Sequence, residues 1–140
     1  MELSPYIIAP AVAWLIAQTA KYFVQAYKAS SFKDMSFFYK SGNMPSSHSA
    51  LMLALMTVIA VRDGVSSGLF GAVAVLTVIV LYDAVNVRRS VGEQGLILLN
   101  LAKKAGLEDP FYRAMGHRIT EVVVGSFIGI LAGIVVLQFM

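Results

Sequence analysis

The chain alternates long apolar runs with short polar segments. Apolar residues dominate positions 5–27, 49–61, about 65 or 68 to 85, and 119–140. A helix rises about 1.5 Å per residue, so the first and last runs are long enough to cross a hydrocarbon core of about 30 Å. The run 49–61 is short, and to cross the membrane it must either include the residues from Pro45 onward or tilt little. The pattern predicts an all-α integral membrane bundle with about four transmembrane helices.

Polar residues and glycines predict where these helices end. Arg62-Asp63-Gly64 predicts a tight turn, and so an antiparallel pair of helices on either side of it. Between the third and fourth spans lies a polar segment, which we expect to hold a helix to about residue 105, followed by a loop or short surface helix over 106–116. The last span carries a small residue every fourth position, a spacing that favours close helix packing over chemistry: Gly125, Gly129 and Gly133.

Composition narrows the class of protein. The chain has 140 residues, of which 58% are hydrophobic and only 14% are charged, far below the roughly 25% charge of ordinary soluble domains. This predicts one membrane-embedded domain over 1–140. There is no cysteine, so no disulfide or thiolate chemistry is available. The net charge of +3, without a basic face interleaved with aromatics, suits anionic lipid headgroups and not nucleic acid.

Charge also predicts the orientation in the membrane. Four spans put the loops 28–48 and 86–118 on one side, and both histidines, His48 and His117, belong to that side. Of 11 Lys and Arg residues, all but Lys21 and Arg62 lie in these two loops. By the positive-inside rule this side faces the cytoplasm, in the cell membrane.

His117 and Glu121 are the most informative pair. A spacing of four puts both side chains on one helix face, where a carboxylate can accept the imidazole N–H and fix the tautomer. Such a histidine can act as nucleophile, general base or metal ligand. Few further ligands are available for a metal, so we assign none and expect no cofactor. A carboxylate at membrane depth needs a partner, which favours a functional pair over one that merely caps the helix.

The segment 41–49 is the second polar cluster. Ser46, Ser47 and Ser49 surround His48 after Pro45, where a starting helix offers free amides and the positive end of its dipole. Such a place can hold a phosphate. Serines after a proline are also common N-caps, and that alternative stays open.

Three further cations are candidates for phosphate binding. Arg88 and Arg89 follow the third span, and because neighbours on a helix diverge by about 100°, one of the two is expected to point inward. The alternative is a pair that only sets topology. Lys21 lies about two turns inside its helix end, and either snorkels to the interface or points into the bundle.

These motifs resemble those of a known superfamily. Pro45-Ser46-Ser47-His48-Ser49 is similar to the Pro-Ser-Gly-His motif of the type 2 phosphatidic acid phosphatase and vanadium haloperoxidase superfamily, and residues 117–125 resemble its His-x-x-x-Asp motif with the Val-x-x-Gly that follows. Lys21 and Lys28 resemble a degraded Lys-x6-Arg-Pro motif. The whole chain most resembles the small divergent branch. It departs from the superfamily in Ser47 for glycine, Glu121 for aspartate, and a missing Ser-Arg, for which Arg88 or Arg89, or less well Arg113, would stand in.

The resemblance implies a metal-free phosphoryl transfer through a phosphohistidine. His117 would attack phosphorus, Glu121 would orient it and His48 would protonate the leaving lipid alcohol. The phosphate oxygens would be held by a further set of residues: Lys21, Lys28, Ser46, Ser47 and Arg88 or Arg89.

We therefore expect a membrane phosphatase acting on a phospholipid or polyprenyl phosphate, as an ester or pyrophosphate. So small a bundle is expected to self-associate to enclose a polar site. The alternative is a non-catalytic membrane module that binds anionic lipid or a partner protein. A carrier is disfavoured, because no broken helix pair or internal repeat is evident.

Overall fold

The structure, a computed structural model, describes residues 3–30, 44–107 and 116–140. These ranges contain helices and turns and no strand. The helices are α1 (Pro5–Lys28), α2 (Ser47–Arg62), α3 (Gly68–Tyr82), α4 (Arg88–Lys104) and α5 (Ile119–Phe139), with a π-helical turn at Asp83–Val87. The predicted helical membrane bundle is confirmed, and Gly64 ends the turn after α2 with a positive φ of 85°.

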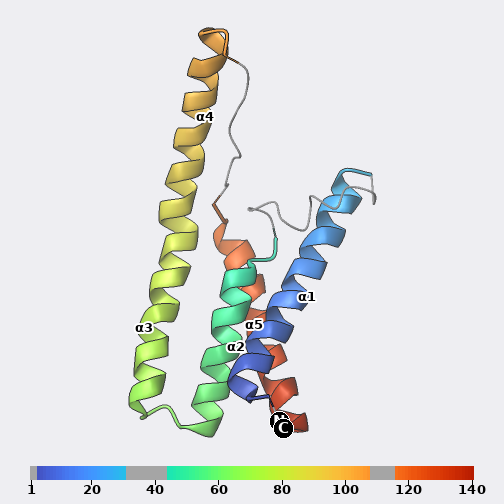
Figure 1. The fold of residues 1–140 in the computed structure, drawn as a ribbon, viewed down its shortest axis with the longest axis vertical. Coiled ribbons are helices and arrows are strands. Elements are labelled where there is room, and N and C mark those ends of the chain that lie inside the picture. The colour runs from blue at the N-terminus through green and yellow to red at the C-terminus, as the bar shows by residue number, and fades with distance from the viewer. Residues whose placement is uncertain (1–2, 31–43, 108–115) are drawn as a thin grey trace.

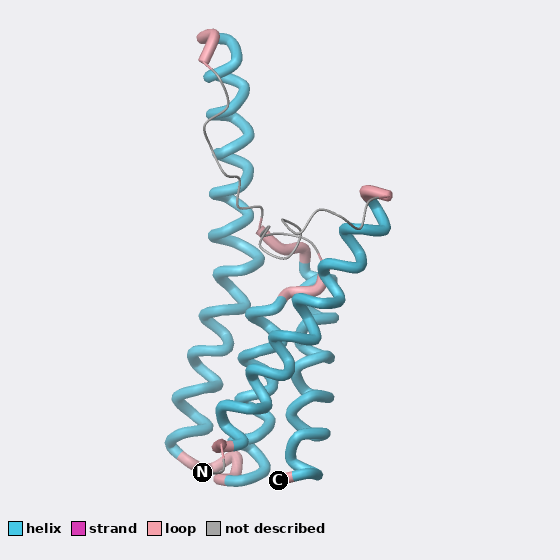
Figure 2. The backbone as a smooth tube through the Cα atoms, turned by 45° about the vertical axis from the view of Figure 1, so that its right-hand side comes forward, coloured by secondary structure: helices cyan, strands magenta, loops and turns pink. Residues whose placement is uncertain are grey.

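The third predicted span does not end where its apolar run ends. The π-helical turn joins α3 to α4, so Gly68–Lys104 is one helix of 37 residues, unbroken in Figure 2. At about 1.5 Å per residue it is roughly 56 Å long, well beyond a hydrocarbon core of about 30 Å. The polar segment between the third and fourth spans is therefore a helical extension, as expected to about residue 105.

The short helix α2 lies at the centre of the bundle. In the described part of the chain, three helices are long and apolar enough to cross a membrane, namely Pro5–Lys28, Gly68–Lys104 and Ile119–Phe139, whereas α2 has only 16 residues. α2 packs against α5, α1 and α3, and Figure 1 shows it between them. In its first turn Ser47, Ser49 and Ala50 are thus buried within the protein.

α1 meets its neighbours through a row of residues at four-residue spacing. Ala9, Ala13 and Ala17 are fully buried and belong to the main apolar core. The same row continues with Lys21 and Gln25, both buried. One face of α1 thus changes from methyl groups to long polar side chains as it nears the end of the helix that carries Lys28.

The glycine stripe of α5 lies against the backbone of α2. A Cβ on Gly125 would overlap the Ser46 carbonyl, and one on Gly129 would overlap the carbonyl of Ala50. A Cβ on Gly133 would press on Thr57. The stripe therefore serves close helix packing, as its spacing predicts.

We expect Gly129→Ala to destabilise the bundle. The added methyl group has no room beside Ala50, and overpacking of this kind costs about 1–3 kcal/mol. Thermal unfolding in detergent measures the effect. Gly71→Ala is the matched control, because nothing lies within 4 Å of the site of its Cβ, and Ala is favoured over Gly inside a helix by about 0.5–1 kcal/mol. Equal melting temperatures for both variants would contradict the packing argument.

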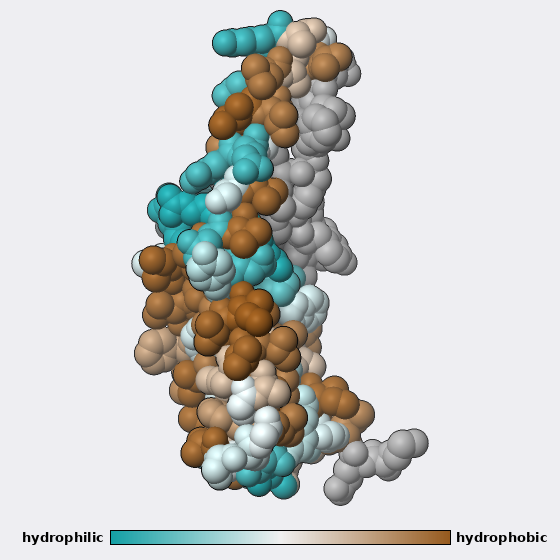
Figure 3. Space-filling model, turned by 90° about the vertical axis from the view of Figure 1, so that its left-hand side faces the viewer, coloured by the Kyte–Doolittle hydropathy of each residue, from teal (hydrophilic) through white to brown (hydrophobic). Residues whose placement is uncertain are grey.

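The candidate site residues of α1, α2 and α5 lie at one end of the bundle. The end of α1 and the starts of α2 and α5 lie on the same side, the side toward which α4 projects (Figures 1 and 2). In Figure 3 apolar side chains cover the flank of α3, and a polar band crosses the surface where α3 passes into α4. Exposed residues on this flank include Val75, Val78 and Ile79, which suits contact with lipid tails.

Candidate functional site

His117 is fixed by backbone contacts before α5 begins. Its amide donates to the Ala84 carbonyl at 3.0 Å, across to the π-helical turn. The preceding residue, Gly116, lies so close to the backbone of Arg88 and Arg89 that a Cβ there would overlap it. Glycine is thus required for this approach, and the His117 side chain is only 5% exposed.

The π-helical turn explains why a carbonyl is available to His117. The amide of Arg88 donates to Asp83, five residues back, where an α-helix would use Ala84. The Ala84 carbonyl can therefore accept the His117 amide instead. A local change in helix winding ties the start of α5 to the long helix.

Glu121 holds the His117 ring and caps its own helix. One oxygen, Oε2, lies 2.9 Å from His117 Nδ1 and also accepts the amide of Arg118 at 3.2 Å. The contact predicted from the spacing is present, and the same carboxylate oxygen also caps the start of α5. Because Nδ1 faces the carboxylate, the other ring nitrogen, Nε2, is the one left for a ligand or substrate.

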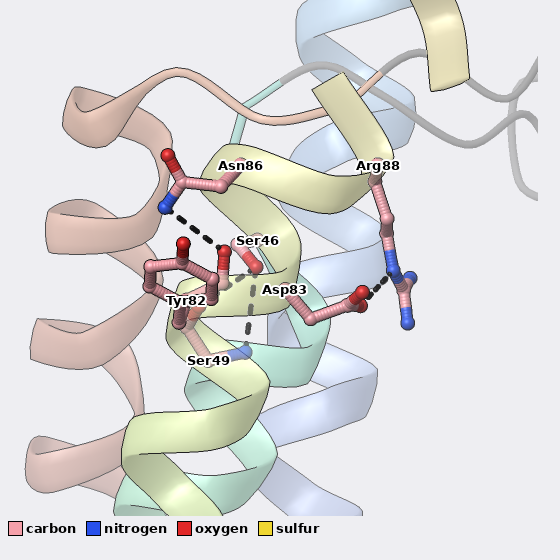
Figure 4. A network of polar contacts seen from close by, with 6 residues as sticks. All are labelled: Ser46, Ser49, Tyr82, Asp83, Asn86 and Arg88. Atoms are coloured by element: carbon pink, nitrogen blue, oxygen red, sulfur yellow. Dashed lines mark hydrogen bonds and ion pairs between the residues drawn. The ribbon is translucent and has the colours of Figure 1, made fainter. Parts of the chain in front are cut away.

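The start of α2 is built around Ser46. Its hydroxyl accepts the Ser49 hydroxyl at 2.8 Å and the Ser49 amide at 3.4 Å, so it serves as the N-cap (Figure 4). Its own amide donates to the Glu121 carbonyl at 3.0 Å, which joins the first turns of α2 and α5. The amides of Ser47 and His48 have no acceptor among the described residues, so this turn keeps two donors for an anion.

The two histidines come together. His48, exposed at the start of α2, interacts electrostatically with His117 and with Arg88. Lys21 of α1 is only 4% exposed and interacts with both His48 and Glu121. Of the two predicted positions for Lys21, the structure has the one inside the bundle. No group of three His, Asp or Glu side chains suited to a metal occurs within the described ranges.

The two arginines border His117 differently. Arg88 Nε lies 2.6 Å from Asp83 Oδ2, a half-buried ion pair that turns the guanidinium back along the helix (Figure 4). Arg89 pairs with Glu93 at 3.1 Å in an exposed contact. It also lines an open cavity of about 670 Å³ whose wall includes His117. The cavity is bounded by the following described residues: Arg89, Gly92, Glu93, Leu96, Gly116, His117, Arg118, Ile119 and Thr120.

Lys28 stands apart from the histidines. It is exposed at the end of α1, about two turns beyond Lys21, beside a shallow apolar hollow of about 380 Å³. Among the described charged groups, those that interact electrostatically with His48 are Arg88, His117, Lys21 and Asp83, and Lys28 is not one of them. Arg113, the weaker substitute for the missing Ser-Arg, and most of the loop 106–116 lie outside the described residues.

Comparison with known proteins decides the family. A family model described as "Divergent PAP2 family" matches residues 4–132. The chain belongs to the divergent PAP2 family. It is also 32% identical to YuiD of Bacillus subtilis (strain 168), named an uncharacterized membrane protein, over 149 aligned positions that cover 95% of this chain and 94% of YuiD. No solved structure matches the chain.

In this member of the divergent PAP2 family, sequence reasoning missed several residues at the site. The sequence pattern assigns no role to Asp83 or Ala84. It places Gly116 at the end of a loop, although a glycine directly before a candidate histidine is a signal of close backbone approach. Gln25 falls within the apolar run 5–27 and is not singled out, yet its four-residue spacing from Lys21 puts it on the same face.

Proposed function

We propose that this protein is a membrane phosphatase that hydrolyses phosphate esters or pyrophosphates of lipids through a phosphohistidine. The observation that carries the proposal is the His117–Glu121 pair at 2.9 Å, with His48 and the buried Lys21 close enough to interact with it. A histidine held through Nδ1, beside cations and free amides, suits attack on a phosphate.

The reaction begins with His117 Nε2 attacking phosphorus. The bond from phosphorus to the leaving oxygen breaks as the nitrogen–phosphorus bond forms, and His48 gives a proton to that oxygen. Glu121 keeps the Nδ1 proton in place and stabilises the positive charge that develops on the ring. Water, deprotonated by His48, then attacks the phosphohistidine and releases phosphate and free His117.

The phosphate oxygens need positive charge and donors throughout the transfer. Lys21, already inside the bundle, is the central cation of this proposal. The free amides of Ser47 and His48 add two donors from the first turn of α2. The Ser46 hydroxyl acts through its cap, which shapes this turn.

The arginines and Lys28 complete the proposed phosphate site. Arg88, oriented by Asp83, approaches from the side of His48, and Arg89 approaches from the cavity beside His117. Lys28 contacts the part of the headgroup that projects furthest along α1. We further propose that the protein sits in the cell membrane with these loops in the cytoplasm, and that it self-associates.

Phosphate release by the purified full chain tests the proposal. We expect release from a panel of phosphatidate, phosphatidylglycerophosphate and a polyprenyl pyrophosphate, with activity retained in EDTA and inhibited by vanadate, which mimics the five-coordinate phosphorus. Binding of these lipids without any release would instead support a non-catalytic module for anionic lipid. Activity that appears only with an added divalent metal would contradict the phosphohistidine route.

A further inference from the structure

Gln25 carries a buried donor with nothing to bind. Its side chain is 8% exposed, and Nε2 has no hydrogen-bond partner among the described residues. Burial of an amide without a partner destabilises a folded protein. Such a donor in a natural protein calls for an acceptor, which an ordered water or a bound ligand can supply.

The position of Gln25 on α1 indicates which ligand its side chain would contact. It follows Lys21 by one helical turn, so the two buried side chains leave α1 on the same side. Lys21 interacts with Glu121 and His48, so the reacting phosphate and Gln25 share one face of α1. α1 continues past the first turn of α2 (Figure 1), which puts Gln25 about 6 Å further toward the open end of the bundle.

We propose that Gln25 Nε2 donates a hydrogen bond to a second phosphate group, next to the one that reacts at His117. An amide N–H alone would donate to any acceptor oxygen. Lys28, a further turn along the same helix, adds positive charge beyond Gln25 and makes an anionic acceptor the best fit. This inference rests on the proposed function, since it names the substrate class of the same site: lipids that carry two phosphate groups.

The second phosphate can come from two sources. In a pyrophosphate the two groups share an oxygen, so both fall within reach of side chains one helical turn apart. In a headgroup such as glycerophosphate on a phosphodiester, a glycerol separates them. In both cases a phosphate oxygen accepts a hydrogen bond from the Gln25 amide. Binding measured with one analogue of each kind distinguishes the two sources.

Binding of non-hydrolysable analogues to the full-length protein tests the inference without relying on turnover. The probes are a prenyl methylenediphosphonate, a prenyl phosphonate of equal chain length and the phosphonate analogue of phosphatidylglycerophosphate. Gln25→Leu should weaken binding of a two-phosphate probe by about tenfold or more, the loss expected for a hydrogen bond to a charged group, and leave the prenyl phosphonate unchanged. The two-phosphate probe that loses affinity identifies the source.

The control is the same substitution at the opposite end of the bundle, Gln138→Leu, at an exposed position near the end of α5. It should change none of the affinities. Gln25→Glu serves as a second variant should leucine prevent folding, and its negative charge should weaken the two-phosphate probe still further.

Equal losses for one-phosphate and two-phosphate probes, or no loss in any Gln25 variant, would overturn the inference. Wild-type protein that binds none of the probes would overturn it as well. Failure of the proposed function gives a different result from failure of this inference: the probes would bind, but no lipid in the activity panel would release phosphate.

Discussion

Replacement of His117 by alanine should abolish phosphate release. In the proposed reaction the imidazole supplies the atom that forms the covalent intermediate, and loss of a nucleophile of this kind lowers turnover by roughly 10³-fold or more. The measurement is steady-state phosphate release by purified His117→Ala, together with acid-labile, base-stable labelling of wild-type protein by a radiolabelled lipid phosphate. Activity in the variant near the wild-type level would remove His117 as the nucleophile.

An aryl phosphate separates the roles of the two histidines. Its leaving group needs no proton, so His48→Ala should lose much less activity with this substrate than with a lipid ester, where general acid catalysis is worth about 10²–10⁴-fold. His117→Ala should lose activity with both substrates. Thr120→Ala is the control for a general disturbance of the site's structure, because Thr120 is exposed and lines the same cavity as His117.

Glu121→Gln should lower turnover by about 10²–10⁴-fold, because it removes the charge that holds the His117 tautomer. A glutamine amide can donate to Nδ1, which would leave the proton on Nε2 and block attack on phosphorus. Its oxygen can still accept the amide of Arg118, so the start of α5 should stay folded. Phosphate release and thermal unfolding, measured on the same preparation, separate these two effects.

Glu121→Asp is the matched control for that substitution. It keeps the negative charge, but its side chain is one methylene shorter and lies further from His117 Nδ1, which is 2.9 Å from the carboxylate of Glu121 in the wild type. An intermediate rate is expected, between those of wild type and Glu121→Gln. If the Glu121→Gln variant and the wild type released phosphate equally fast, the Glu121 carboxylate would serve only to cap the start of α5.

The local parts of the site could be predicted from the sequence. The spacing of His117 and Glu121 fixes their contact within one helical turn, and serine after proline at position 46 is a recognisable helix start. The helix ends followed from apolar length and from the turn at Gly64. These features depend on neighbours a few residues away.

The long-range parts could not be derived in this way. A helix to about residue 105 was expected, but its unbroken join to α3 was not, because a π-helical turn leaves no mark in hydropathy. The contact of Gly116 with the backbone of α4 joins segments that no local pattern connects. That His48 and His117 meet was expected only from topology and the family resemblance.

The alanine row of α1 and the glycine stripe of α5 both repeat every four residues. Such repeats fit equally well after a shift of one turn, so packing alone leaves α1 free to slide by about 6 Å against its neighbours. The attraction between Lys21 and Glu121 removes this freedom, since a slipped helix would leave the buried Lys21 ammonium without a carboxylate beside it. The residues proposed for chemistry thus also select one alignment of the helices, and a variant that neutralises both charges should lose structural uniqueness along with activity.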